Sequence, residues 1–83
     1  MVRPATTYED GSLRAWPVRP HGHVKMFFTG TRRGQRLKCE QVAETRADGM
    51  GKAILRVPED LRGEVWVKCE ECQVVSKAVA VAT

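Results

Sequence analysis

Hydrophobic and polar residues alternate along most of the chain after residue 22, with the period of two expected of a strand that buries one face. Val24, Met26 and Phe28 fall on one side of such a segment, whereas Leu55 and Val57 share one side of another. Clusters of glycine, proline and aspartate separate these segments at intervals typical of short strands. We therefore predict strands near residues 23–29, 35–46, 51–57, 64–69 and 73–81, with a further strand near 13–18.

This pattern predicts an all-β protein, a small antiparallel barrel or sandwich of about five or six strands. No segment between the turns is long enough to favour a strong helix. Asp48-Gly49 is the strongest hairpin signal, and it predicts that the strand at 35–46 pairs with the strand at 51–57.

The first 22 residues differ from the rest because they contain three of the four prolines and no apolar run. This composition predicts an extended N-terminal arm at 1–22, followed by a single small β domain at 23–83. Such an arm becomes ordered by lying on another surface. Its large side chains are candidate partner-binding residues: Tyr8, Arg14 and Trp16. The alternative is that Trp16 packs on Trp66 and closes a small barrel.

The length and the charge of the chain limit the classes of function that it can have. With 83 residues the core is small, so a metal, a partner or self-association would add useful stability. No apolar run approaches the length of a membrane span and no secretion signal is recognisable, which favours a cytoplasmic protein, or a virion component if the source is viral. Residues 1–38 hold eight basic and two acidic side chains, hence +6, whereas 39–83 hold six and eight, hence −2. This asymmetry favours an anionic partner, although an ordinary solvated surface explains it equally well.

The cysteines carry the most suggestive motif. Leu37-Lys38-Cys39-Glu40-Gln41-Val42 matches Val67-Lys68-Cys69-Glu70-Glu71-Cys72 thirty positions later, with Val42 in place of a fourth cysteine. Two such knuckles, each after a strand, resemble a zinc ribbon over residues 37–76. The resemblance implies one structural zinc held by Cys39, Cys69 and Cys72, with His23 as a possible fourth ligand. The alternative is no cofactor, with the cysteines buried as small apolar groups.

Arg32, Arg33 and Arg36 surround a predicted hairpin that follows Phe27 and Phe28. Basic side chains beside aromatic rings are typical of nucleic-acid contacts, so these arginines are further candidate partner-binding residues. The simpler interpretation is that they keep the hairpin soluble.

No catalytic triad, phosphate-binding glycine loop or paired carboxylates emerge from the sequence, so we expect a protein that is not an enzyme. The leading hypothesis is a binding or structural subunit that docks on a larger protein assembly through its arm and strand edges, such as a viral capsid accessory or decoration protein. An inhibitor of a host enzyme fits the same features, and a homo-oligomer is possible. The alternative hypothesis is a zinc-ribbon-like factor that binds nucleic acid or a nucleic-acid enzyme.

Overall fold

Eight strands account for most of the chain in the computed structural model, which describes residues 3–70 and 74–81. No described residue lies in a helix, so none belongs to a helix able to cross a membrane. The strands are β1 (Ala5–Glu9), β2 (Ser12–Trp16), β3 (His23–Arg32), β4 (Gln35–Arg46), β5 (Ala53–Arg56), β6 (Leu61–Cys69), β7 (Val74–Val75) and β8 (Val79–Val81).

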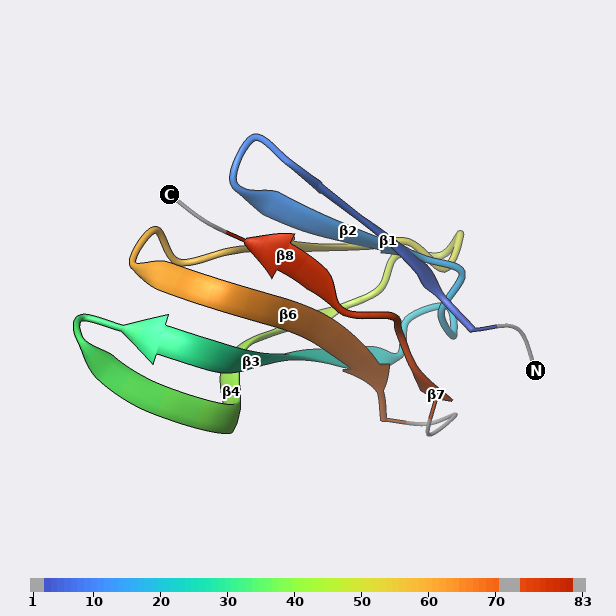
Figure 1. Ribbon diagram of the computed structural model, residues 1–83. Coiled ribbons are helices and arrows are strands. Elements are labelled where there is room, and N and C mark those ends of the chain that lie inside the picture. Colours follow the sequence, from blue (N-terminus) through green and yellow to red (C-terminus); the bar gives the residue numbers. More distant parts are fainter. Residues whose placement is uncertain (1–2, 71–73, 82–83) are drawn as a thin grey trace.

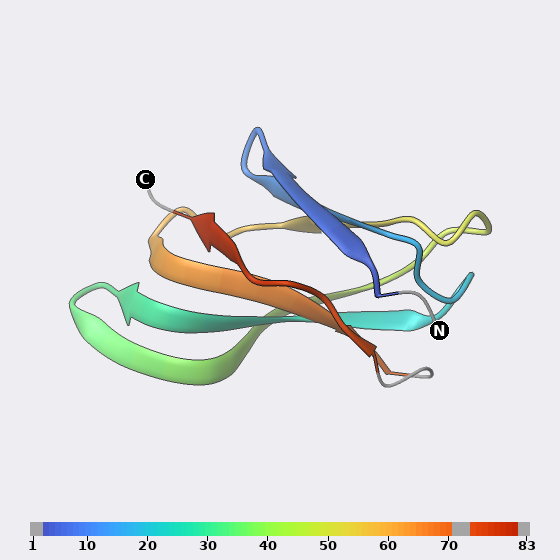
Figure 2. The same cartoon turned by 45° about the vertical axis from the view of Figure 1, so that its right-hand side comes forward.

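The strands form two antiparallel sheets that lie one above the other (Figures 1 and 2). The smaller sheet has the order β1-β2-β5. The larger has the order β4-β3-β6-β7, and β8 pairs with β6 beyond the end of β7. The sheets do not close into a barrel. The prediction of a small all-β sandwich is therefore confirmed.

The core lies between the sheets and is built from the inward-facing residues of both. Leu13 and Leu55 come from the three-stranded sheet, while Met26, Phe28 and Val65 come from the five-stranded sheet, and all five are almost fully buried. Because successive residues of a strand point to opposite faces, the residues between them lie on the two outer faces of the sandwich. These outer faces are where partner-binding side chains can be sought.

The extended arm predicted for residues 1–22 is wrong over residues 5–16. This segment forms the β1–β2 hairpin and belongs to the smaller sheet, with Leu13 and Ala15 inside the core. Asp10 and Gly11, at φ 52° and 76°, make the two-residue turn, a conformation that an Asp-Gly pair adopts readily. The physical reason is the alternation along β2, where Leu13 and Ala15 point into the core and the residues beside them point outward. A segment with one buried face pairs as a strand of the sheet.

Two predicted contacts are also wrong. The strand at 35–46 pairs with β3, and β5 pairs with β2, so the Asp48-Gly49 turn lies in a connection between sheets and joins no hairpin. Trp66 stacks on its cross-strand neighbour Phe27 on the outside of the larger sheet, with ring centroids 6.3 Å apart. Trp16 lies on the smaller sheet and is 54% exposed, so it does not close a barrel with Trp66.

The strand predicted at 73–81 is interrupted by Ser76. Its hydroxyl oxygen accepts a hydrogen bond from the Val67 N–H at 2.9 Å, and its own N–H donates to the Val67 carbonyl. A side chain therefore occupies a place in the β6 ladder that a backbone carbonyl would otherwise take. This divides the segment into β7 and β8.

Candidate interaction surface

The zinc-ribbon resemblance is wrong. Among the described residues, no group of three or more histidine, cysteine or acidic side chains can hold a metal ion. Cys39 is exposed beside Thr29, whereas Cys69 is buried opposite Val24. Thr29 and Val24 are five positions apart on β3, which corresponds to roughly 16 Å along the strand. Cys72 lies outside the described residues.

His23, the fourth predicted ligand, lies on the outer side of β3. Its Nε2 is 2.8 Å from Nη2 of Arg46, and because a guanidinium can only donate, this nitrogen accepts the hydrogen bond. Cys69 faces the core on the opposite side of the same sheet. Residues 37–42 of the repeat lie on β4 and residues 67–69 lie at the end of β6. Both strands flank β3, but Cys39 and Cys69 are not brought together.

The predicted basic hairpin is formed by β3 and β4, and its three arginines differ in their ion pairs. Arg33 and Gly34, at φ 50° and 78°, turn the chain from β3 into β4. Asp60 accepts a hydrogen bond from Nε of Arg32 at 3.1 Å, and it forms an ion pair with Nε of Arg33 at 2.9 Å. The hydrogen bond from Arg32 is the main cause of the lowered pKa of Asp60. Arg36 makes no ion pair with any described residue and lies on the outer face of β4.

The outer face of the smaller sheet carries an unusual concentration of exposed apolar side chains. Across the part of the chain that is described, four large hydrophobic residues are exposed, and three of them gather here: Trp16 (54%), Ile54 (59%) and Met50 (73%). Trp16 and Ile54 project from the neighbouring strands β2 and β5, and Met50 lies in the loop at their end. We call these three residues, with Arg14, Lys52 and Arg56, the Trp16 face.

The loop from Ala47 to Lys52 is held in place by Asp48. One carboxylate oxygen of Asp48 accepts the N–H of Met50 at 2.8 Å and the N–H of Lys52 at 2.9 Å. These bonds lower the pKa of Asp48, with the bond from Lys52 contributing most. Trp16 Nε1 in turn donates to the Met50 carbonyl at 3.3 Å. The exposed Met50 and Trp16 are therefore positioned by one connected set of hydrogen bonds.

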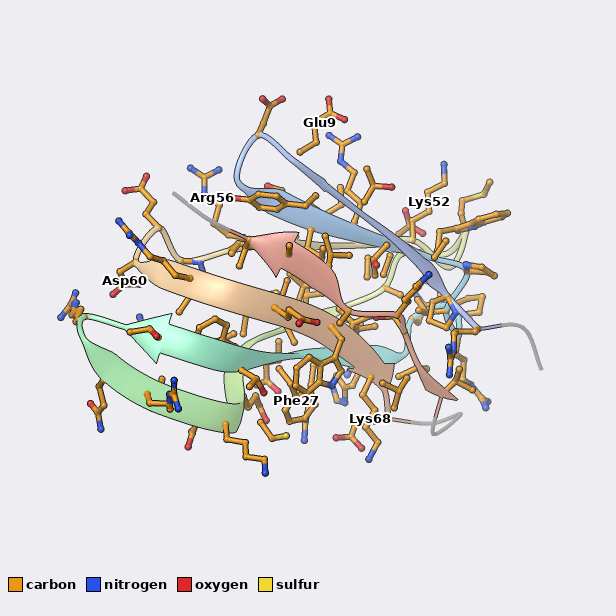
Figure 3. All side chains as sticks on the ribbon, viewed as in Figure 1. Glu9, Phe27, Lys52, Arg56, Asp60 and Lys68 are labelled. Carbon is orange, nitrogen blue, oxygen red and sulfur yellow. The ribbon has the colours of Figure 1, made fainter. Side chains whose placement is uncertain are left out.

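Positive charge borders this apolar surface. Arg14, on the central strand β2, pairs in register with Ile54 on β5. Arg56 is the last residue of β5, and Lys52 directly precedes that strand. Figure 3 shows Lys52, Arg56 and Glu9 on the side of the molecule opposite Phe27 and Lys68. Within residues 3–70 and 74–81, neither Arg14 nor Arg56 forms an ion pair.

A hollow of about 500 Å³ opens on the Trp16 face. Arg14, Trp16 and Ile54 line it together with the small side chains of Ala5 and Thr7 on β1. The small residues leave room beside the indole ring. A partner's side chain can therefore enter between a flat aromatic surface and a guanidinium.

Of the predicted partner residues, Arg14 and Trp16 meet on this face, but Tyr8 does not join them. Tyr8 pairs with Leu13 and packs against the core, on the other side of β1 from Thr7.

Ile54 was not predicted from the sequence as a surface residue. The available signal was its outward position between the inward-facing Ala53 and Leu55.

Comparisons with protein-family models, with curated proteins and with solved structures find no match to this chain.

Proposed function

We propose that the protein is a non-catalytic binding subunit that docks on a larger protein assembly through the Trp16 face. The observation that carries this proposal is the clustering of Trp16, Met50 and Ile54 on one outer surface, each more than half exposed. Exposed apolar clusters rimmed by polar residues are characteristic of protein interfaces, and tryptophan and arginine are the commonest anchors within them.

The charges on this face define the chemistry of the partner. Arg14 and Lys52 line the hollow of the Trp16 face together with Asp48, whereas Arg56 borders a separate hollow that Asp10 and Glu59 also line. Arg14 is at the centre, on the middle strand and opposite Ile54. Covering it with an apolar surface alone would leave a buried unpaired charge, which is costly. The proposed partner surface is therefore apolar with a carboxylate placed to meet Arg14.

A small accessory or decoration subunit of a capsid is one member of this class and remains our particular proposal. Such a subunit needs a rigid presenting surface and no reactive group. The rigidity is supplied by the Asp48 hydrogen bonds, which place Met50 beside Trp16 before any partner arrives. Preorganisation of this kind reduces the entropy lost on binding.

Site-specific photo-crosslinking in the native host cell tests the proposal. A photoreactive phenylalanine analogue at Ile54 should give one discrete adduct with a protein other than this chain. The same analogue at Gln41, exposed on β4 of the other sheet, is the matched control and should give none. Adding Arg14→Glu should remove the Ile54 adduct.

Three outcomes would contradict the proposal. They are no adduct at Ile54, an equal adduct at Gln41, or an adduct of twice the mass of the chain. The last would identify the partner as a second copy of this protein.

A further inference from the structure

The outer face of the larger sheet bears a row of cations at its hairpin end. Thr31 on β3 pairs in register with Arg36 on β4 and with Arg62 on β6. Directly opposed residues of antiparallel strands project from the same face, so two arginines flank one hydroxyl. We call Arg36, Thr31 and Arg62 the arginine row.

The geometry of the row suits a phosphate group. Arg36 and Arg62 are two strand spacings apart, which is about 10 Å between backbones. Their long side chains can converge above the Thr31 hydroxyl, and paired guanidinium groups bind phosphate oxygens well. Thr31 borders two adjoining hollows, of about 460 Å³ beside Arg33 and Arg62 and about 290 Å³ beside Arg36 and Lys38.

The balance of charge at this end is positive. Arg32, Arg33, Arg36, Lys38 and Arg62 supply five positive charges, while Asp60 and Glu64 supply two negative ones, leaving +3. Asp60 is committed to Arg32 and Arg33. Within the described ranges, Arg36, Lys38 and Arg62 form no ion pair and stay available to a ligand.

An aromatic pair lies on the same face, four residues along β3 from Thr31, or about 13 Å. The rings of Phe27 and Trp66 are inclined by only 22° and are half-buried by their surroundings. Lys68, two residues after Trp66 on β6, projects on the same side as Phe27 (Figure 3). On this face Glu64 lies between Arg62 and Trp66, so one cation lies beyond a carboxylate on that side and Lys68 lies on the other side of the aromatic pair.

We infer that this face binds single-stranded nucleic acid, with the arginine row and Lys38 on phosphates and the Phe27–Trp66 pair beneath a base. Unpaired bases can stack on an aromatic surface, whereas bases inside a duplex cannot reach one, so the aromatic pair favours a single strand. This binding site is separate from the Trp16 face, which belongs to the opposite sheet.

Fluorescence anisotropy with a labelled oligodeoxythymidine of about twelve nucleotides, and with a duplex of the same length, tests the inference. The single strand should bind more tightly. Arg36→Ala/Arg62→Ala should reduce the slope of log K against log salt by about 1.4, or about 0.7 for each lost phosphate contact. Arg14→Ala/Arg56→Ala, on the other sheet, removes the same charge and is the matched control.

Stacking has its own readout. In a Trp16→Phe variant, Trp66 is the remaining tryptophan, and its fluorescence should be quenched by the oligonucleotide. Absence of binding at about 50 mM salt would overturn the inference. The inference would also be overturned if Arg14→Ala/Arg56→Ala reduced the salt slope as much as Arg36→Ala/Arg62→Ala. It would be overturned equally if the duplex bound as tightly as the single strand and left Trp66 fluorescence unchanged.

Discussion

Asp48 controls the Trp16 face through a single carboxylate oxygen. Because its hydrogen bonds favour the ionised form, the pKa of Asp48 is lowered in the folded protein. A lowered folded-state pKa means that the unfolded chain binds the proton more tightly. The stabilisation is therefore complete above the ordinary carboxyl pKa of about 4 and is lost as the pH falls through the lower folded value.

We predict that acid loosens the Met50 loop before it unfolds the sandwich. In a Trp66→Phe variant, Trp16 is the only tryptophan left, and its fluorescence should change below about pH 4 as the Asp48 carboxylate is protonated. Asp48→Asn keeps an acceptor oxygen but cannot titrate in this range, so it should abolish that step. A step of the same size in Asp48→Asn would show that another group is responsible.

At the level of elements, the pairing of β3 with β6 contains two opposed glycines that leave no room for a side chain. Gly30 and Gly63 are directly opposed, with φ of 155° and 152°. A Cβ added to Gly30 would lie 2.2 Å from the Arg62 carbonyl oxygen and 2.8 Å from Cα of Gly63. Both obstacles are backbone atoms, so the strands themselves would have to separate. This crossing holds Thr31 and Arg62 in register.

We predict that Gly30→Ala destabilises the protein by more than about 3 kcal/mol, beyond the usual cost of a point mutation. Gly34→Ala is the control, because Gly34 also has a positive φ, of 78°, but nothing lies within 4 Å of the added Cβ. It should cost only about 1 kcal/mol, from the left-handed backbone. Urea unfolding of both variants measures the difference. Equal losses would mean that backbone strain alone, and not the crossing, requires glycine.

The positions of strands were predictable where hydrophobic and polar residues alternate clearly. The partner of a strand was predicted wrongly where the pairing depends on residues far apart in the sequence. Residues 35–46 form a strand with the predicted bounds, and Val24, Met26 and Phe28 face the core as predicted. The Asp10-Gly11 pair is a hairpin signal as strong as Asp48-Gly49, but the prolines around it favoured an arm. An Asp-Gly turn alone does not determine its partner strand, because sheet membership depends on long-range packing.

The candidate site was predictable only in part. Arg14, Trp16 and Arg36 were identified from residue type, since large aromatic and basic side chains are common in interfaces. Their neighbours Ile54 and Arg62 come from other strands and are brought alongside by the register. The cysteine repeat led to the wrong prediction of a zinc site. Similar sequences on two strands do not place their cysteines on one face, and here Cys39 is exposed whereas Cys69 is buried.

At the level of the whole molecule, the N-terminal hairpin is part of the fold. Deleting residues 1–16 would remove β1 and β2, and with them the strand neighbour of β5 and the buried Leu13 and Ala15. We predict that the shortened chain does not fold, with loss of amide dispersion in NMR spectra and of cooperative thermal unfolding. Deletion of residues 1–4 leaves every described strand intact and should be tolerated. A folded 17–83 fragment would contradict this description.

The central claim is that the sandwich presents two separate binding faces, one to protein and one to nucleic acid. The most direct measurement assays both activities in two folded variants whose thermal unfolding matches the parent. Arg14→Glu/Ile54→Thr should lose the protein partner identified by crosslinking and keep oligonucleotide binding. Arg36→Ala/Arg62→Ala should show the reverse. Loss of both activities in either variant, or of neither, would contradict the claim.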